Sequence, residues 1–290
     1  VQQLFSQGKL AFLSNIGTLV EPVQDYNEYR SGLKKLPLGL YSHSDQIEQW
    51  QTSVPQDRNA IGWGGRMADI LQDMNSLGNI SMNISLSGRN VFQSGQNTIE
   101  YTISNDGNGS EGLDSFAPWI SNSGFLNRLR KDAVESLMEE TYQNVFQSTF
   151  GKTVQQSFDA QEAFASAVGA VPPIMTPFED HYLAQNLHMV ARTIAAREAL
   201  GANRQTFFMT FGGLDHHNEV LDNQLYMLGV VSRALNSFYS ALEEIGMENN
   251  VTTFTISDFA RTLTTNGNGS DHSWGGNQLV MGGMVNGQRI

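Results

Sequence analysis

A long amphipathic segment between residues 219 and 245 dominates the hydrophobic pattern of the chain. Its apolar positions recur at spacings of three, four and seven, the period of one face of an α-helix. They are Leu221, Leu225, Leu228, Leu235, Phe238, Leu242 and Ile245. Asn218 is a suitable N-cap, and Gly246 with the polar residues after it ends the pattern. The sequence therefore predicts a helix over residues 219–245.

Short apolar runs lie on both sides of this helix, at residues 207–211 and 251–256. A strand, a helix and a second strand, with a crossover of this length, favour a right-handed βαβ unit with buried, parallel strands. In a parallel α/β sheet, ligand sites lie beyond the carboxyl ends of the strands. We therefore expect the functional residues of this region directly after residues 211 and 256.

The remaining pattern predicts further helices and a change of character in the middle of the chain. The apolar face formed by Leu183, Leu187, Val190 and Ile194 predicts a helix before the first of these strands. Short β-prone runs at 80–86, 91–92 and 98–103, separated by Gly, Asn and Ser, predict a small hairpin insertion. The other predictions are a helix end at 1–8, a strand at 10–15, helices from Ser44 or Asp45 and at 67–75, a Gly-rich connector at 105–120, and a helical region at 122–168.

Acidic and histidine side chains follow the two predicted strands in succession. Asp215 and His217 come after the first strand and Asp258 after the second, and a Gly/Asn-rich loop then carries Asp271 and His272. Each aspartate alone could equally cap a helix. Carboxylates that face one another unpaired repel, so a divalent cation is the simplest reason to bring them together. The five residues together therefore favour a metal site.

The neighbours of these residues suggest the kind of chemistry. A carboxylate and imidazole set without cysteine is typical of Zn²⁺, Mn²⁺ or Mg²⁺ in hydrolytic work rather than of a structural zinc. On a turning loop, His216 would point away from an ion shared by its neighbours, towards substrate or solvent. Arg261 is either a partner in a surface salt bridge or a cation aimed at an anionic substrate. His181 and His188 are expected to have ordinary packing or surface roles.

Composition limits the classes of protein that remain. The chain has 290 residues, 40% hydrophobic and 16% charged, which is ordinary for a globular protein, and it has no cysteine. The formal net charge of −12 and the absence of a dense basic cluster oppose binding to nucleic acid. No apolar run is long enough to predict insertion into a membrane. We therefore expect a small-molecule partner, and the sequence leaves the oligomeric state open.

Several segments resemble one known family. Gly213-Leu214-Asp215-His216-His217 is similar to Gly-Trp-Asp-Thr-His, and Ser257-Asp258-Phe259-Ala260-Arg261-Thr262 is similar to Ser-Glu-Phe-Gly-Arg-Thr. Gly269-Ser270-Asp271-His272 resembles Gly-Thr-Asp-His, and Ser42-His43-Ser44 resembles Ser-His-Phe. Gly8-Lys9-Leu10-Ala11 and Gly62-Trp63-Gly64-Gly65-Arg66 also match segments of this family. Together they resemble domain-of-unknown-function family 1501, exported bacterial proteins with an alkaline-phosphatase-like, sulfatase-like core.

The resemblance implies an alkaline-phosphatase-like α/β/α sandwich with a mostly parallel sheet, with residues 77–170 as an insertion or cap that includes the small hairpin. It also implies roles for individual residues. Ser42 matches the nucleophile, Arg261 supports the transferred group, and His43 and His216 lie beside the substrate. The implied metal ligands are Asp215, His217, Asp258, Asp271 and His272.

The resemblance finally implies a function and a location. The protein would be a periplasmic or secreted metal-dependent hydrolase of phosphate or sulfate esters, or of a related anionic group. Residues 1–290 would be one domain incomplete at both ends, with a first strand and its metal-binding aspartate upstream of Val1. This piece alone would then bind metal poorly and have little activity. The alternatives are a non-catalytic binding protein that retains the fold, and an envelope-associated scaffold.

Overall fold

The chain forms a mixed α/β structure, seen here in a computed structural model that describes residues 1–76, 80–109, 123–140 and 142–290. The elements are α1 Gln2–Ser6, β1 Leu10–Ile16, α2 Tyr26–Arg30, α3 His43–Thr52, α4 Trp63–Leu71, the 3-10 turn Gln72–Met74, β2 Asn83–Ser85, β3 Tyr101–Thr102, α5 Ser123–Glu139, α6 Val145–Gly169, α7 Tyr182–Ala195, β4 Thr206–Phe208, α8 Val220–Glu244, β5 Thr253–Phe254, β6 Ala260–Thr265, β7 Ser270–Ser273 and β8 Gly276–Met281.

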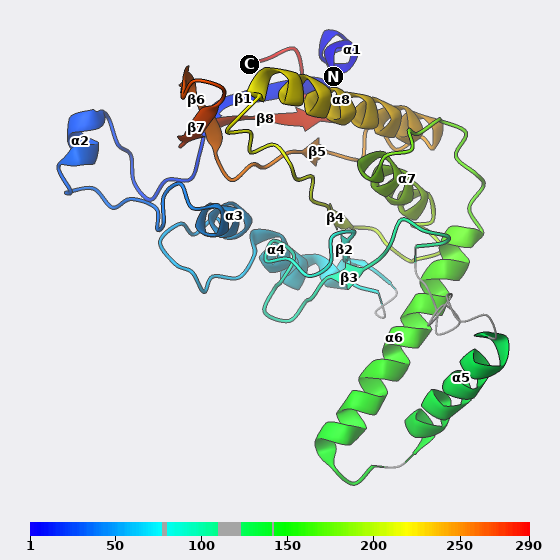
Figure 1. Cartoon of the computed structure of the whole chain (residues 1–290). Helices are drawn as coiled ribbons and strands as arrows, with labels where there is room; N and C mark the ends of the chain where they lie inside the picture. The colour runs from blue at the N-terminus through cyan, green and yellow to red at the C-terminus, as the bar shows by residue number, and fades with distance from the viewer. Residues whose placement is uncertain (77–79, 110–122, 141) are drawn as a thin grey trace.

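The described strands form three small sheets. β3, β2 and β4 are parallel neighbours in that order, and β1, β8 and β5 form an antiparallel sheet. β6 and β7 form a separate antiparallel hairpin. Figure 1 places the antiparallel sheet beside α8 and the parallel sheet beside α4, with β4 and β5 between them. The α/β character is therefore confirmed, and one of the sheets is parallel.

Helices α7 and α8 build the main core, as the periodicity predicts. Leu183, Leu187, Val190 and Ile194 of α7 are all buried in one apolar cluster. The same cluster holds the second half of α8 and the inner side of β1 and β8. Burial of each such side chain stabilises the fold by about 1.5–3 kcal/mol. The predicted helix at 219–245 is confirmed by α8, which begins and ends within one residue of the prediction.

The start of α8 differs from the prediction in two respects. The N-cap is Glu219 rather than Asn218, and its backbone is left-handed with φ 50°. The predicted apolar face is buried only in its second half, since Leu221, Leu225 and Leu228 are 83%, 78% and 55% exposed. The reason is that the packed part of the cluster begins near Val230, so nearly three turns at the start of α8 extend past it.

The prediction that the strands near 207–211 and 251–256 belong to one parallel sheet is wrong for the described residues. β4 pairs only with β2, and β5 pairs only with β8. Both strands are short, and their residues are half-buried or exposed rather than buried. The run at 260–265 and the predicted loop at 271–272 instead form β6 and β7, which pair with each other. Non-local pairing of this kind leaves no signal in the local pattern.

The predicted hairpin at 80–103 is also wrong. β2 and β3 are parallel, with Ile84 opposite Tyr101, so the connection between them is a crossover. The run at 91–92 lies against α4, where Gly65 N donates to Phe92 O at 2.9 Å. Gln93 fixes this crossover because its side-chain amide donates to Ile84 O at 3.0 Å. The proposed insertion at 77–170 thus contributes two strands to the parallel sheet.

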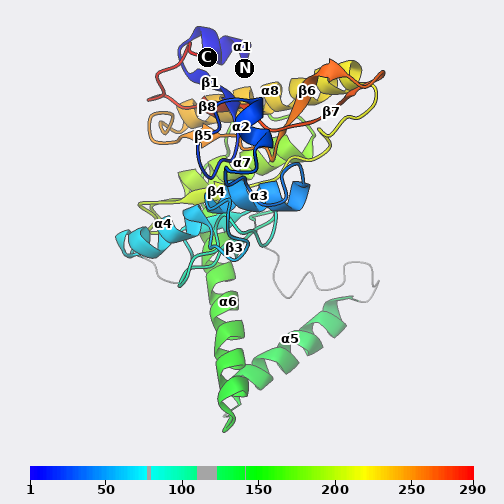
Figure 2. The same ribbon diagram turned by 90° about the vertical axis from the view of Figure 1, so that its left-hand side faces the viewer.

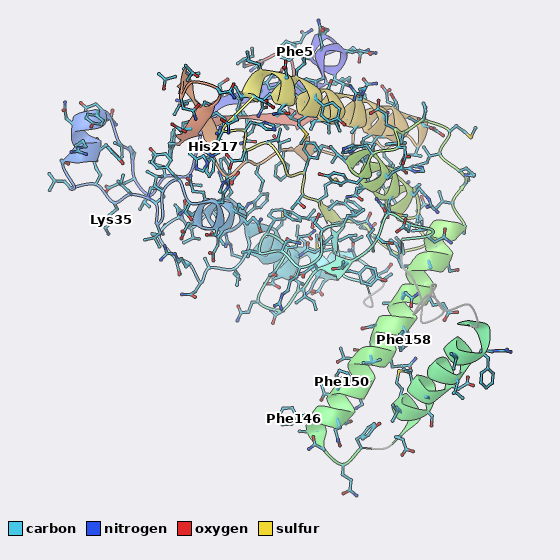
Figure 3. The ribbon with its side chains drawn as sticks, viewed as in Figure 1. Phe5, Lys35, Phe146, Phe150, Phe158 and His217 are labelled. Carbon is cyan, nitrogen blue, oxygen red and sulfur yellow. The ribbon has the colours of Figure 1, made fainter. Side chains whose placement is uncertain are left out.

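The helices α5 and α6 project from the rest of the molecule as an arm, which Figures 1 and 2 show from two sides. Phe146 and Phe150, labelled in Figure 3, are largely exposed near the far end of α6. The other end of α6 is packed, since Phe164 and Val168 are fully buried.

Part of the Gly-rich connector predicted at 105–120 lies outside the described residues. No helix in the described part of the chain has the length and apolar character needed to span a bilayer.

Candidate metal and catalytic site

Five segments place the predicted site residues at one end of the molecule. The turn Gly212-Gly213 after β4 carries Asp215 and His217, and Gly213 has φ 91°, which favours glycine. Asp258 follows β5, Arg261 lies on β6 and His272 lies on β7. His43 is the first residue of α3. The site therefore depends on tertiary contacts between residues as far apart as His43 and His272.

Three ligand atoms form a nearly regular triangle at the centre of the site. Asp215 Oδ1 lies 3.2 Å from His217 Nε2 and 3.1 Å from His272 Nε2, and the two imidazole nitrogens are 3.2 Å apart. Ligands held at about 2.0–2.1 Å from a tetrahedral zinc are about 3.3 Å from one another. The spacing of the three atoms thus fits a single small divalent cation. Figure 3 labels His217 beside the β6–β7 hairpin.

His43 connects this triangle to Asp258. Its Nε2 lies 3.2 Å from Asp215 Oδ2, and its Nδ1 lies 2.6 Å from Asp258 Oδ2. Ligand atoms of His43, Asp215 and His272 lie within 4.8 Å of one another, so His43 could also contribute to an ion site. The hydrogen bond to Asp258 raises the pKa of His43 above its ordinary value, and the charge of Asp215 adds to this effect. His43 thereby separates two carboxylates that would otherwise repel.

Arg261 supplies a fixed positive charge at the same carboxylate. Its Nη1 donates to Asp215 Oδ1, and its Nη2 donates to the backbone oxygen of Ser270. Its Nε is buried and has no hydrogen-bond partner among the described atoms. Burial alone would raise the pKa of Asp215, but the charges of Arg261, His217 and His272 outweigh burial and lower it. Asp215 is therefore held as a carboxylate.

Three predicted residues have other contacts in this structure. Ser42 is the N-cap of α3, and its Oγ accepts from Asp45 N over a long 3.5 Å contact. His216 points away from the triangle and lies 3.1 Å from the amide of Gln224. Asp271 is exposed, and its Oδ1 is 3.6 Å from His217 Nδ1, so it can orient that ring rather than share the ion.

Aromatic and glycine residues that the sequence pattern does not single out shape the site. The Phe259 ring packs against the rings of both His43 and His272, with centroids 4.6 and 3.9 Å away. Trp50 donates from its indole nitrogen to Asp258 O at 3.2 Å. A Cβ at Gly269 would overlap the backbone of His217, so glycine lets the β6–β7 turn approach the ligands. Only the position of Phe259 directly after Asp258 hints at its role in the sequence.

Comparison with known proteins gives one match. A family model described as "Protein of unknown function (DUF1501)" matches residues 41–290, a range that contains every residue of this site. Searches of the curated proteins and of the solved structures found no match.

Proposed function

The chain belongs to the DUF1501 family, and we propose that it is a metal-dependent hydrolase of phosphate or sulfate esters. The observation that carries this proposal is the triangle of Asp215 Oδ1, His217 Nε2 and His272 Nε2, with sides of 3.1–3.2 Å. A carboxylate and two imidazoles leave open positions on a catalytic metal, whereas structural zinc sites are closed by four protein ligands.

Asp215, His217 and His272 would hold the ion, and His43 with Asp258 would complete its surroundings. Two imidazole ligands favour Zn²⁺ or Mn²⁺ over Mg²⁺, which prefers oxygen ligands. When bound, such an ion supplies Lewis-acid polarisation of an ester oxygen. The hydrogen bond between His43 Nδ1 and Asp258 fixes the ring with its Nε2 directed to Asp215. Such outer-shell contacts set the orientation and basicity of metal ligands.

We assign Ser42 as the nucleophile and Arg261 as the group that binds the anionic part of the substrate. Ser42 Oγ lies at the N-terminus of α3, where the helix dipole favours negative charge. Its contact with Asp45 N is long at 3.5 Å, so the hydroxyl can leave it at little cost. Arg261 can present its guanidinium to ester oxygens, because this group binds phosphate and sulfate geometry well. We propose that His216, whose Nδ1 lies 3.1 Å from the side-chain amide of Gln224 in this structure, contacts the substrate rather than the ion.

We further propose that the fold is an alkaline-phosphatase-like α/β/α sandwich and that the protein acts in the periplasm or outside the cell. Support for the sandwich is the position of β4 and β5 between α8 on one side and α3 and α4 on the other (Figure 1). Support for export is the resemblance of the six sequence segments to exported proteins.

Metal binding tests the first half of the proposal. A calorimetric titration with Zn²⁺ or Mn²⁺ should show one metal-binding site in the wild type. His217→Ala and His272→Ala should weaken the affinity by more than the roughly 10- to 100-fold that loss of an outer-shell partner costs. His216→Ala is the matched control, because its ring is bonded to Gln224 instead of the triangle. Equal affinities in all four proteins would reject the site.

Hydrolysis of an aryl phosphate and an aryl sulfate by the full-length, metal-loaded protein tests the second half. Ser42→Ala should abolish this activity, since loss of a nucleophile costs many orders of magnitude. Circular dichroism should show that the fold is retained, because an N-cap change destabilises by only about 1 kcal/mol. If activity survives in Ser42→Ala but is lost in His217→Ala, the metal site is supported and the nucleophile is a water molecule instead of Ser42.

The second candidate is a non-catalytic protein that binds an anionic ligand. Two contacts favour it: Arg261 already neutralises Asp215, and Ser42 is used as a helix cap. This candidate predicts that full-length protein binds phosphate or sulfate and hydrolyses neither type of ester. Hydrolysis that depends on Ser42 would exclude it.

A further inference from the structure

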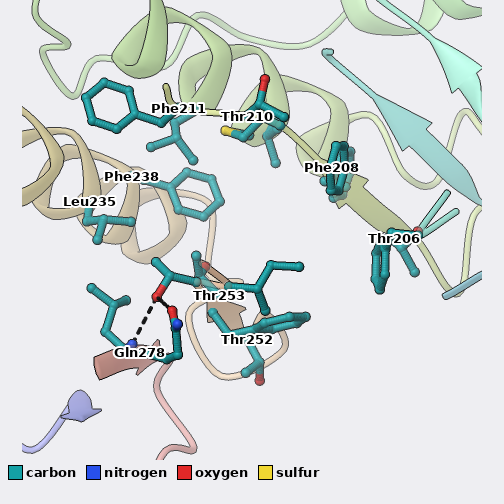
Figure 4. Close-up of a pocket in the computed structure, with 18 of the residues that line it drawn as sticks. Thr206, Phe208, Thr210, Phe211, Leu235, Phe238, Thr252, Thr253 and Gln278 are labelled. Carbon is teal, nitrogen blue, oxygen red and sulfur yellow. Dashed lines mark hydrogen bonds between the residues drawn. The ribbon is translucent and has the colours of Figure 1, made fainter. Parts of the chain in front are cut away.

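The arm formed by α5 and α6 carries exposed apolar side chains at the opposite end of the molecule from His217 (Figure 3). In both Figures 1 and 2 it projects away from the end at which the two chain ends are marked. It is also separate from the cavity between β4 and β5, into which Leu235 and Phe238 point (Figure 4), because that cavity lies within the layer of strands. The arm is therefore a surface distinct from both the proposed metal site and the cavity.

One apolar face runs along the length of α6. Phe150, Phe164 and Val168 are separated by fourteen and four residues, and both spacings return to nearly the same side of an α-helix. Phe164 and Val168 are fully buried near the body, where the Tyr101 ring lies 5.5 Å from the ring of Phe164. At the far end of the helix, Phe146 and Phe150 are 82% and 72% exposed (Figure 3). The face that packs against the body thus continues onto the arm, where it is open.

Helix α5 has an open apolar face as well. Its exposed members recur at spacings of three and four, as on one side of a helix: Leu126, Leu129, Ala133 and Leu137. Val134 and Met138 lie off this face and are half-buried, and α5 packs against α6. Helices in proteins take most of their stability from packing of an apolar face. Two helices that each leave such a face open are therefore suited to a further packed layer.

The exposed apolar area of the arm matches what a stable protein interface needs. Six large apolar residues of the arm are 39–82% exposed: Phe125, Leu126, Leu129, Leu137, Phe146 and Phe150. An aromatic side chain alone can bury about 150–250 Å², so the six together expose on the order of 800 Å². Each partner in an interface of standard size contributes about 800 Å². Burial of these six residues would therefore supply the apolar area of a specific protein contact.

The charges of the arm favour a second copy of the chain over a lipid surface. Residues 123–169 contain four basic and six acidic residues, whereas amphipathic helices that bind anionic bilayers are rich in lysine and arginine. In residues 123–140, the three basic residues all precede the four acidic ones. Two copies of such a helix complement each other when they are antiparallel, because each basic half then lies beside an acidic half. A two-fold axis across the helix produces this antiparallel pair.

We propose that the arms of two copies of the chain pack together as an isologous dimer, with the two α5 helices antiparallel and the open face of α6 covered in the same contact. The four helices then form a bundle, and the apolar faces that are open on a single arm become its core. Leu129 and Ala133 flank the middle of α5, so they lie next to the two-fold axis. Because the arm lies away from His217, the contact leaves both proposed metal sites accessible.

Sedimentation velocity of the full-length protein at about 10 µM tests whether the dimer forms. The wild type should have twice the mass of a single chain. Leu129→Glu brings like charges together at the two-fold axis, and it should raise the dissociation constant of the dimer about 30-fold or more, the effect of losing a hot-spot residue. Ile70→Glu is the matched control, since Ile70 is 78% exposed on α4, outside the arm. This control should remain dimeric, and both variants should keep the circular dichroism of the wild type.

Disulfide cross-linking tests the geometry of the contact. Residues 1–290 contain no cysteine, so a thiol introduced at one position can bond to the same position of a second copy. Ala133→Cys, on the open face of α5, should give a covalent dimer under mild oxidation, with the unmodified protein as baseline. Ala163→Cys is the control, because Ala163 is equally exposed but lies on the part of α6 close to the body. It should cross-link far less.

The same measurements can overturn the proposal. Wild-type protein that stays monomeric up to about 100 µM, a dimer that Leu129→Glu leaves intact, or equal cross-linking at residues 133 and 163 would each do so. Flotation with phosphatidylcholine vesicles gives the remaining outcome. If the wild type is monomeric and floats with the vesicles, and Leu129→Glu does not float, the arm binds a lipid surface instead of a second copy.

Discussion

Replacement of His43 by alanine should reveal how the two carboxylates of the site are held. In the metal-free protein, His43 lies between Asp258 and Asp215, at 2.6 and 3.2 Å. Its pKa is raised, first by the hydrogen bond to Asp258. A folded-state pKa above the unfolded value means that the contribution is complete below about pH 6.5 and is lost as pH rises through the folded pKa. His43→Ala should therefore destabilise the protein more in acid than in base.

The exposure of the three side chains sets the magnitude of this effect. His43 and Asp215 are 47% and 39% exposed, so solvent screens their attraction, and Asp258 at 23% is better shielded. Exposed ion pairs contribute about 0.2–1 kcal/mol. The short hydrogen bond to Asp258 places His43 at the upper end of this range. We expect a loss of about 1 kcal/mol near pH 5.5 and about half of that or less near pH 9.

Urea unfolding of wild type and His43→Ala in the presence of a chelator measures this difference at the two pH values. An NMR titration of the His43 ring gives its pKa directly. In Asp258→Asn the pKa should fall towards its ordinary value, because the strongest cause of the shift is removed. A cost of His43→Ala that is the same at both pH values, together with an unshifted pKa in Asp258→Asn, would refute this electrostatic account.

Three further changes probe other contacts. Arg261→Gln should tighten Zn²⁺ binding several-fold in calorimetry, because it removes a cation that competes for the Asp215 carboxylate. The same variant should hydrolyse the esters more slowly. Weaker Zn²⁺ binding would contradict the competition between Arg261 and the ion. Asp69→Ala should cost about 1–2 kcal/mol in urea unfolding, since this carboxylate accepts from three backbone amides and a hydroxyl of residues 96–98, whereas Asp73→Ala should cost less than about 0.5 kcal/mol. Gly65→Ala should lower thermal stability by about 2 kcal/mol or more, because a Cβ would overlap the backbone of the crossover, while Gly212→Ala, with open space around it, should be nearly neutral; equal effects would contradict the packing of α4.

The helices could be predicted from the sequence, whereas the sheets could not. The periods of α7 and α8 are local properties, and their positions follow from apolar spacing alone. β4 and β5 contain two or three residues each, and their partners are distant in the sequence. Pairing between such distant segments leaves no local signal, so the expected parallel pairing of these two strands is not found. The Gly and Asn residues at 266–269 predict only a loop, so the strands β6 and β7 on either side of this turn were not expected.

The sequence predicted which residues form the candidate site and part of their arrangement. Asp215 and His217 lie after the end of β4, as expected, whereas His272 lies on β7 and reaches them through the β6–β7 hairpin. The bridging position of His43 could not be predicted, since it depends on α3 packing against a segment 215 residues later. The pairing of Arg261 with Asp215 likewise follows from the β6–β7 hairpin, which the sequence pattern did not reveal.

The most direct test of the metal site is anomalous X-ray diffraction at the zinc edge from crystals of the full-length protein grown with Zn²⁺. We expect one anomalous peak about 2.0–2.2 Å from Asp215 Oδ1, His217 Nε2 and His272 Nε2. The peak should be absent from His217→Ala crystals and present in His216→Ala crystals. A zinc peak bound elsewhere, or no peak near this triangle at saturating Zn²⁺, would contradict the proposed function.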